Sequence, residues 1–301
     1  MGRALPRPSD VEANHERPMN WSVAVTISVV LYSIAVILQR SLLRGGKINA
    51  VGFSVVFQLL VAIVLLPIAA IHGLRFEGFE KEILLIMLAS ASFGIGSVVY
   101  AKTLERIGSA EFSVLFATSS FWVALYGVLF LHETLSVVQI IGMLMIFASV
   151  FLLVKKTRKP RLSTGILLGL FTGVIYGIAV TSTSLIGRHV DVITWTWLSF
   201  ITGALASLLV SPRSIVALGP MVTRRTMPKL IILAVFYGIG TLAIMMAYRD
   251  GPFSLVSPLR QTSIIVTTIL AFILVRSERV DMRRKCLAAS VCTVGVILML
   301  L

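Results

Sequence analysis

Residues 30–36 read VLYSIAV and residues 174–180 read VIYGIAV, so one apolar motif occurs twice, 144 residues apart. Further pairs repeat this spacing: Arg44 with Arg188 and GIGS at 94–97 with GIGT at 238–241, both at 144 residues, and Glu133 with Glu278 at 145 residues. Because the near-constant spacing extends over three pairs of apolar runs, it indicates two tandem copies of one unit.

The chain is too apolar for a water-soluble protein of its length. Of its 301 residues, 57% are hydrophobic and 13% are charged, whereas a soluble domain carries about 25% charged residues. The charges lie between ten apolar runs, most of them near the 20 or so residues with which a helix crosses the hydrocarbon core. The predicted spans are Ser22–Leu43, Ala50–Ile71, Ile83–Ala101, Phe112–Leu131, Val137–Val154, Gly165–Ile186, Val192–Val210, Leu230–Ala247, Ser254–Val275 and Cys286–Leu301. Helices are favoured over a β-barrel because hydrophobicity is continuous rather than alternating along each run.

The repeat divides the predicted spans into two units of five. We expect a solvated tail at residues 1–20, a first five-helix repeat at 21–156, a basic linker at 157–163 and a second repeat at 164–301. Because five is odd, the second copy must enter the membrane from the opposite side. The prediction is an all-α polytopic membrane protein with ten transmembrane helices in two inverted repeats, an arrangement typical of alternating-access transporters.

The formal net charge of +14 has its simplest explanation in membrane topology. Loops at the ends of odd-numbered spans carry 19 Lys and Arg residues, whereas the tail and the other loops carry 7. The positive-inside rule then places the more basic side in the cytoplasm and both termini outside. The basic linker is therefore interpreted as a topology anchor, and no nucleic-acid partner is expected. The predicted location is the cell membrane, with the bacterial inner membrane favoured.

Residues 100–136, YAKTLERIGSAEFSVLFATSSFWVALYGVLFLHETLS, resemble the signature of EamA-type transporters of the drug/metabolite transporter superfamily. In that family a helix rich in small residues ends in a Leu-x-Glu turn, which here is Leu131-His132-Glu133. The resemblance implies two inverted five-helix halves around a cavity lined mainly by helices one, three, four, six, eight and nine. Two departures exist. Ser120 and Ile265 stand where the family commonly has proline, and many members have cytoplasmic termini, against the charge count.

Arg260 is the one charged residue well inside a predicted span. Charged residues within the membrane usually face a cavity or a partner, so Arg260 is a candidate ligand for the carboxylate or phosphate of a substrate. Two structural explanations stay open. The ninth span can begin later than predicted, or the side chain can extend to the membrane interface.

Aromatic and polar side chains provide the other candidates for substrate binding. Tyr32 and Tyr176 occupy matched positions on the first helix of each half, and a tyrosine can both stack on a solute and hydrogen-bond it. The remaining candidates are Tyr100, Trp122, Tyr237, Ser120 and Gln261. For all of them, packing between helices is the alternative.

The expected function is transport of a small metabolite, such as an amino acid or nucleoside, by alternating access, with export favoured over import. The sequence has no Walker A motif, and it has neither a metal-ligand pattern nor a cluster of catalytic residues within the spans. We therefore expect no enzyme activity, no catalytic residues, no metal and no cofactor. The expected partners are a small-molecule substrate and the lipid bilayer, and the oligomeric state is left open. The alternatives are a flippase for lipid-linked carriers and, less favoured, a membrane-embedded enzyme.

Overall fold

The computed structural model describes residues 21–44, 48–131, 136–153, 163–187, 189–210, 212, 223–224, 226–250, 256, 259–275, 281–299 and 301. The predicted tail, nearly all of the basic linker, and the loop glutamates Glu133 and Glu278 lie outside these residues.

Ten helices account for most of the described residues, and each overlaps one predicted span. The first half contains α1 (Trp21–Leu43), α2 (Ala50–His72), α3 (Ile83–Arg106), α4 (Ser109–Leu131) and α5 (Val137–Leu153). The second half contains α6 (Thr164–Ile186), α7 (Val192–Val210), α8 (Met227–Asp250), α10 (Ser263–Leu274) and α11 (Met282–Leu298).

Six of these helices are long and apolar enough to cross a bilayer: α1, α2, α3, α6, α7 and α8. Val137–Leu152 and Leu259–Leu274 form shorter apolar helices. These lengths, together with an architecture of helices alone in the described residues, confirm the predicted all-α membrane fold.

Matched asparagine and aspartate residues begin α2 and α7. The side chain of Asn49 accepts hydrogen bonds from the backbone N–H groups of Val51 and Gly52. Asp191 Oδ1 accepts one from the backbone N–H of Thr194 at 2.8 Å. Both side chains satisfy donors that the first turn of a helix cannot pair internally, so they fix where each helix starts.

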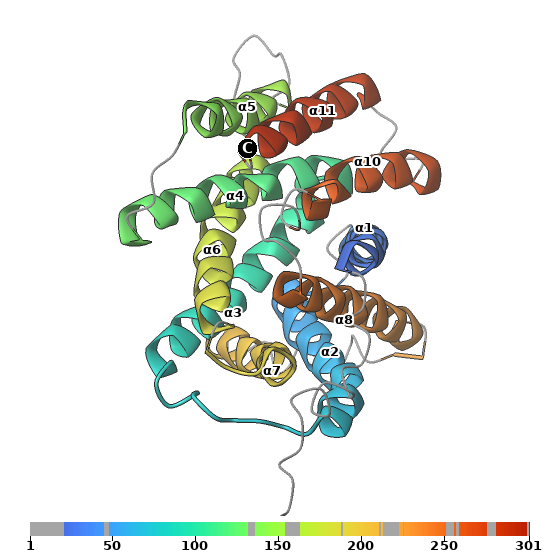
Figure 1. The fold of residues 1–301 in the computed structure, drawn as a ribbon. Helices are drawn as coiled ribbons and strands as arrows, with labels where there is room; N and C mark the ends of the chain where they lie inside the picture. The colour runs from blue at the N-terminus through green and yellow to red at the C-terminus, as the bar shows by residue number, and fades with distance from the viewer. Residues whose placement is uncertain are drawn as a thin grey trace, which may run out of the picture.

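The contacts between the two halves form matched sets (Figure 1). Helix α3 packs on α6, and its counterpart α8 packs on α1. Likewise, α4 packs on α6, and its counterpart α10 packs on α1. The pairs α2 with α7 and α5 with α11 each join one helix to its own counterpart. Figure 1 shows α5 and α11 side by side at one edge of the bundle.

Glycines allow the backbones of several of these helix pairs to come into direct contact. A Cβ added to Gly142 of α5 would lie 2.5 Å from the carbonyl oxygen of Gly295 in α11, and one added to Gly295 would lie 2.7 Å from that of Gly142. A Cβ on Gly94 of α3 would lie 2.9 Å from the backbone of Ala206 in α7. Small residues are the usual means of close packing between membrane helices.

Polar contacts gather at two opposite ends of the helices. His72 Nε2 lies 3.1 Å from Asp191 Oδ2, and His189 Nδ1 lies 2.7 Å from Glu82 Oε1. We call this end the histidine face.

At the other end, Arg40 donates hydrogen bonds to the carbonyl oxygens of Leu104 and Glu105 in the last turn of α3. Lys285 Nζ lies 3.6 Å from Glu111 Oε1, joining α11 to α4. We call this end the basic face. It contains the end of α3 and the start of α4.

Candidate functional site

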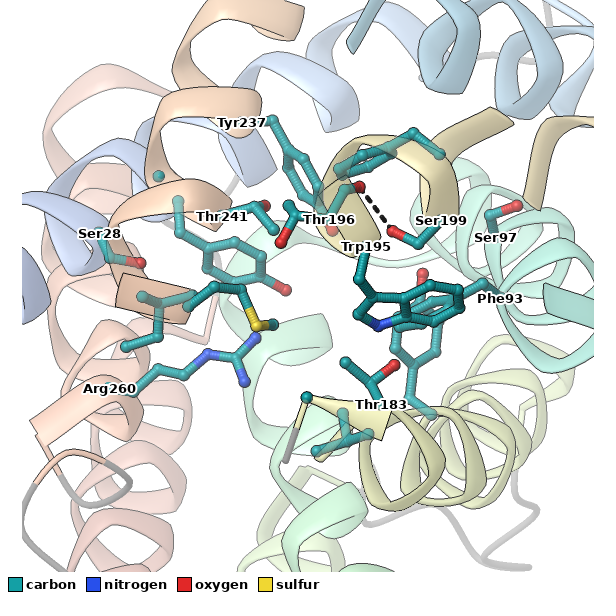
Figure 2. Close-up of a pocket in the computed structure, with 18 of the residues that line it drawn as sticks. Ser28, Phe93, Ser97, Thr183, Trp195, Thr196, Ser199, Tyr237, Thr241 and Arg260 are labelled. Carbon is teal, nitrogen blue, oxygen red and sulfur yellow. Dashed lines mark hydrogen bonds between the residues drawn. The ribbon is translucent and has the colours of Figure 1, made fainter. Parts of the chain in front are cut away.

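A cavity of about 430 Å³ lies between the two halves (Figure 2). Its walls come from α1, α2, α3, α4, α6, α7 and α8, together with Arg260 just before α10 and Ser263 at the start of α10. Leu185, Gly187 and Val192 line it beside the loop of the histidine face, so the cavity extends toward that face. The volume is within the range of pockets that hold small molecules.

Four of the predicted site residues line this cavity: Arg260, Tyr32, Tyr176 and Tyr237. The other four lie elsewhere. Gln261 Nε2 donates a hydrogen bond to Ser120 Oγ at 2.6 Å, which joins these two predicted residues to each other across α4 and the segment before α10.

The remaining two predicted residues, Trp122 and Tyr100, pack between helices. Trp122 lies against α6, where a Cβ added to Gly177 would be 2.5 Å from Trp122 Cβ. Tyr100 is 4% exposed and packs edge-on to Phe112, with their ring centroids 4.4 Å apart. Trp122 is therefore in the packing position that the sequence left open as an alternative.

Aromatic rings close the cavity toward the basic face. The ring centroid of Tyr237 lies 5.8 Å from that of Tyr32 and 4.9 Å from that of Phe57. Phe116 continues the layer, with ring centroids 6.4 Å from Tyr32 and 5.0 Å from Tyr176. The matched tyrosines of the two repeats thus meet in one layer at the centre of the protein. We call these five residues the aromatic layer.

Arg260 reaches this cavity from the segment directly before α10. Residues 259–261 are helical, Thr262 forms a turn, and the regular helix α10 begins only at Ser263. Helix α10 therefore starts nine residues after the predicted beginning of the span at Ser254. Figure 2 shows the guanidinium of Arg260 extending into the cavity from this segment.

Helices α2 and α7 supply lining residues that the sequence interpretation did not include. They are Phe57, Gln58, Val192, Trp195, Thr196, Ser199 and Phe200. Gln58 Nε2 donates hydrogen bonds to Ser97 Oγ at 2.9 Å and to Ser207 Oγ at 3.0 Å, which ties α2 to α3 and α7. A glutamine within an apolar run was the available signal, because such residues usually face other protein groups rather than lipid.

A second and much smaller hollow, of about 10 Å³, lies on the other side of the aromatic layer. It is lined by Gln39, Phe53, Ser54, Phe57, Ser97, Tyr100, Tyr176 and Tyr237. Gln39 directly precedes Arg40, which bonds to the end of α3 at the basic face. The hollow therefore lies toward the basic face, and the large cavity lies toward the histidine face.

The surroundings of Asp191 at the histidine face lower the pKa of its carboxyl group. Partial burial raises the pKa of its carboxyl group, but hydrogen bonds from the Thr194 backbone and hydroxyl and from His72 outweigh burial and lower the pKa below its ordinary value. The carboxylate is thus held ionised where it caps α7 and contacts the end of α2.

Among the described residues, no group of three or more His, Cys, Asp or Glu side chains is arranged to hold a metal ion. The expected absence of a metal and a cofactor stays a prediction.

Comparison with solved structures returns several chains that match this fold, among them a crystal structure of a protein. That structure superimposes with a TM-score of 0.61 at 13% sequence identity, over 92% of this chain and 98% of the other. A search among curated proteins returns no significant match.

The sequence model of the EamA-like transporter family matches the chain twice, at residues 19–155 and at residues 163–301. The two matches together cover most of the chain, and each includes one of the five-helix halves. The apolar helices are those of a multi-pass membrane protein, as transport across a membrane requires. The chain belongs to the EamA-like transporter family, within the drug/metabolite transporter superfamily.

Proposed function

We propose that this transporter carries a small metabolite by alternating access, with its central site opening in turn to the histidine face and to the basic face. The two halves are then inverted repeats. Helix α1 ends at the basic face, where Arg40 contacts the end of α3. Its counterpart α6 begins at the same face. Gly165, near the start of α6, lies so close to the end of α3 that an added Cβ would be 2.5 Å from Ile107. Opposite directions of matched helices support the inversion.

The register of the repeat, meaning the number of positions between counterpart residues, differs slightly from one helix pair to the next. Tyr32 and Tyr176 match at 144 residues on α1 and α6, and the GIGS and GIGT motifs match at the same separation on α3 and α8. Helix α2 is capped by Asn49 and α7 by Asp191. These two capping residues are 142 positions apart, two fewer than the 144 positions of the other pairs. Counterparts on α2 and α7 are therefore matched in this shorter register.

One observation carries the proposal: every residue that lines the small hollow has a counterpart that lines the large cavity. The pairs are Gln39 with Thr183, Phe53 with Trp195, Ser54 with Thr196, Phe57 with Ser199, Ser97 with Thr241, Tyr100 with Ile244, Tyr176 with Tyr32, and Tyr237 with Phe93. We infer that the hollow is the closed counterpart of the cavity. An exchange of conformation between the halves would close one and open the other.

Buried polar atoms support the same interpretation. In the described part of the chain, Gln39 Oε1 and Thr183 Oγ1 are buried without a hydrogen-bond partner, and these two residues are counterparts. An unpaired polar atom is costly in an apolar interior. Such atoms are expected along a path that water and solute enter when it opens.

The charge distribution supports an orientation of the protein in the membrane. The basic face has the larger number of Lys and Arg residues in its loops, so we propose that it faces the cytoplasm of a bacterial cell. Both termini then lie outside, and the large cavity opens outward. Export remains our preferred direction. A flippase for lipid-linked carriers is the second candidate, and we propose no enzymatic activity.

Cysteine accessibility tests alternating access. Starting from a variant in which Cys286 and Cys292 are replaced by serine and alanine, a single cysteine is placed at Thr196 in the cavity or Ser54 in the hollow. In oriented proteoliposomes, a membrane-impermeant thiol reagent should modify Thr196→Cys from the histidine face only and Ser54→Cys from the basic face only. A transported solute should change the two rates in opposite directions.

The control is Ser149→Cys, because Ser149 is fully buried in α5, outside the helices that form the cavity, and its hydroxyl bonds to its own helix. Modification of the cysteines at 54 and 196 from the same face would contradict alternating access. Flux assays with a solute panel separate the functional classes. Product formation without translocation would identify an enzyme, and movement of a lipid-linked substrate alone would identify a flippase.

A further inference from the structure

Arg260 is the only charged side chain among the described residues that line the cavity. The remaining lining residues are apolar, including aromatic residues and Met245, or are uncharged and polar, including Gln58. In such a poorly solvated space, a guanidinium interacts strongly with an anionic group, and its planar donors suit a carboxylate or a phosphate.

Two further donors in the wall are distinguished by their lack of partners. The Trp195 side chain is 1% exposed, and within the described residues its Nε1–H has no hydrogen-bond partner. Thr183 is 7% exposed, and its hydroxyl likewise has no partner in that part of the chain. An indole N–H that is buried usually finds an acceptor.

The neighbouring hydroxyl groups of the cavity already have partners. Thr181 Oγ1 donates to the Gly177 carbonyl at 2.9 Å, and Thr196 Oγ1 donates to the Val192 carbonyl at 2.7 Å. Ser199 Oγ donates to the Thr196 carbonyl at 2.7 Å, the bond drawn in Figure 2. Trp195 and Thr183 are therefore set apart from the other polar residues of α6 and α7 that line the cavity.

Arg260 extends from one wall of the cavity, and Trp195 and Thr183 project from the opposite wall (Figure 2). Resting on the proposed transport function, we propose that this space binds the carboxylate of an organic monoanion. Arg260 supplies the opposite charge, and Trp195 Nε1–H and the Thr183 hydroxyl donate the remaining hydrogen bonds.

The donor set favours a carboxylate over a phosphate ester. The guanidinium of Arg260, the indole N–H of Trp195 and the Thr183 hydroxyl suit the two oxygens of a carboxylate, whereas a phosphate monoester near pH 7 brings nearly two negative charges and three acceptor oxygens, which are costly to place in a low-dielectric site. The aromatic layer below the site suits an apolar or aromatic body attached to the carboxylate. The structure thus assigns organic monocarboxylates, zwitterionic amino acids included, as the substrate class.

Binding to the purified full chain in nanodiscs tests this class, with thermal stabilisation as the readout. The probes are 3-phenylpropionate, phenylalanine, the neutral amide 3-phenylpropionamide and the cation phenethylamine. Carboxylates should stabilise the protein, whereas the amide and the amine should not. Arg260→Ala should weaken carboxylate binding by about 10- to 100-fold, and Arg260→Lys by less.

Thr183→Val removes one donor while preserving shape, and Trp195→Phe removes the other while keeping an aromatic ring of smaller size; each should weaken binding by about three- to tenfold. Thr172→Val is the matched control on the same helix, because Thr172 is not among the residues that line the cavity and its hydroxyl is bonded to the Leu168 carbonyl at 2.7 Å, and it should bind like the wild type. Unfolding temperatures without ligand identify any variant that fails to fold, and Arg260→Lys and Thr172→Val then carry the comparison.

Equal binding of the acid and the amide, or unchanged carboxylate binding in a folded Arg260→Ala variant, would overturn the carboxylate site. If none of the carboxylates binds while proteoliposomes transport neutral or cationic solutes, the carboxylate site is wrong and the transport function stands. If carboxylates bind as described but no solute of the panel moves, the site stands and transport is what fails.

Discussion

The ring of Tyr176 packs on Gly96 of α3, where an added Cβ would lie 3.0 Å from the ring carbon Cε2. The matched Gly240 of α8 faces the backbone of α1 rather than a ring, because an added Cβ would lie 3.3 Å from Leu31 Cβ and 3.7 Å from the backbone nitrogen of Tyr32. Each half therefore supplies a glycine that receives the tyrosine-bearing helix of the other half. These contacts lie directly at the aromatic layer, between the cavity and the hollow.

Gly96→Ala is expected to destabilise the protein. The new methyl group would meet both Tyr176 and Ile175 Cγ2, the latter at 3.1 Å, so the ring must move by a few tenths of an ångström. Crowding of this kind costs about 1–3 kcal/mol, which outweighs the gain of up to about 1 kcal/mol in helix propensity. Thermal unfolding in nanodiscs should show a lower Tm, and solute flux should fall because the layer is constrained.

Gly238→Ala is the matched control on α8. Its new methyl group would lie 3.3 Å from Val61 Cγ1 and 3.6 Å from Leu65, the ends of side chains that can adjust. Its Tm should stay near that of the wild type. An equal or higher Tm for Gly96→Ala than for Gly238→Ala would show that the contact with Tyr176 is not tight.

Gln58→Leu should lower the free energy of unfolding. It removes the two N–H groups of Gln58 Nε2, which are shared among Ser97 Oγ, Ser207 Oγ and, within α2 at 3.1 Å, the Ser54 carbonyl. Hydrogen bonds between membrane helices contribute about 0.6 kcal/mol each, so the loss of the contacts to α3 and α7 should be measurable by thermal unfolding. Ser90→Ala, which removes a single bond to Thr202 between α3 and α7, should cost less. Equal losses for the two variants would contradict this network.

Much of this fold could be predicted from the sequence, because a bilayer requires long apolar helices and charges mark their ends. The repeat by itself also placed Tyr32 and Tyr176 on matched helices. The sequence did not show which individual residues face the cavity. The shorter register of α2 and α7 hid Trp195 as the counterpart of Phe53, and periodicity in uniformly apolar helices does not say which face meets the cavity.

The segment directly before α10 illustrates the same limit. Its two neighbouring polar side chains take different positions, and the apolar run around them does not indicate which one faces the cavity. Arg260 lines the cavity. Gln261, its neighbour, bonds to Ser120 instead of lining the cavity, although both were predicted as site residues from the same run.

The stability of the histidine face should depend on the ionisation of Asp191. Because the folded state lowers the pKa of this carboxyl, the stabilising contribution is fully present above the ordinary value of about 3.9 and is lost as the pH falls through the lowered value. The Tm difference between wild type and Asp191→Asn should therefore be constant above about pH 5 and shrink below about pH 4. Thermal unfolding from pH 3 to pH 7 measures both curves.

Asparagine is a suitable replacement because it still caps α7. Among the described residues, His72 is the titratable group that contacts Asp191, so the pair of curves is repeated with His72→Gln in both proteins. A difference that stays unchanged down to pH 3, or that closes between pH 5 and pH 7 in the His72→Gln background, would contradict the assignment.

The ion pair between Lys285 and Glu111 should help to keep the basic face closed. It joins α11 of the second half to α4 of the first half, and the Lys285 side chain is 8% exposed. Glu111→Gln preserves size and removes the charge, so the open state of the basic face should gain about 1 kcal/mol relative to the closed one. The thiol at Ser54→Cys should then react up to about fivefold faster from that face.

Glu105→Gln is the control, because Glu105 pairs at 4.0 Å with Arg106 on its own helix. A rate that does not change in Glu111→Gln, or that rises equally in Glu105→Gln, would show that this ion pair has no part in closing the basic face.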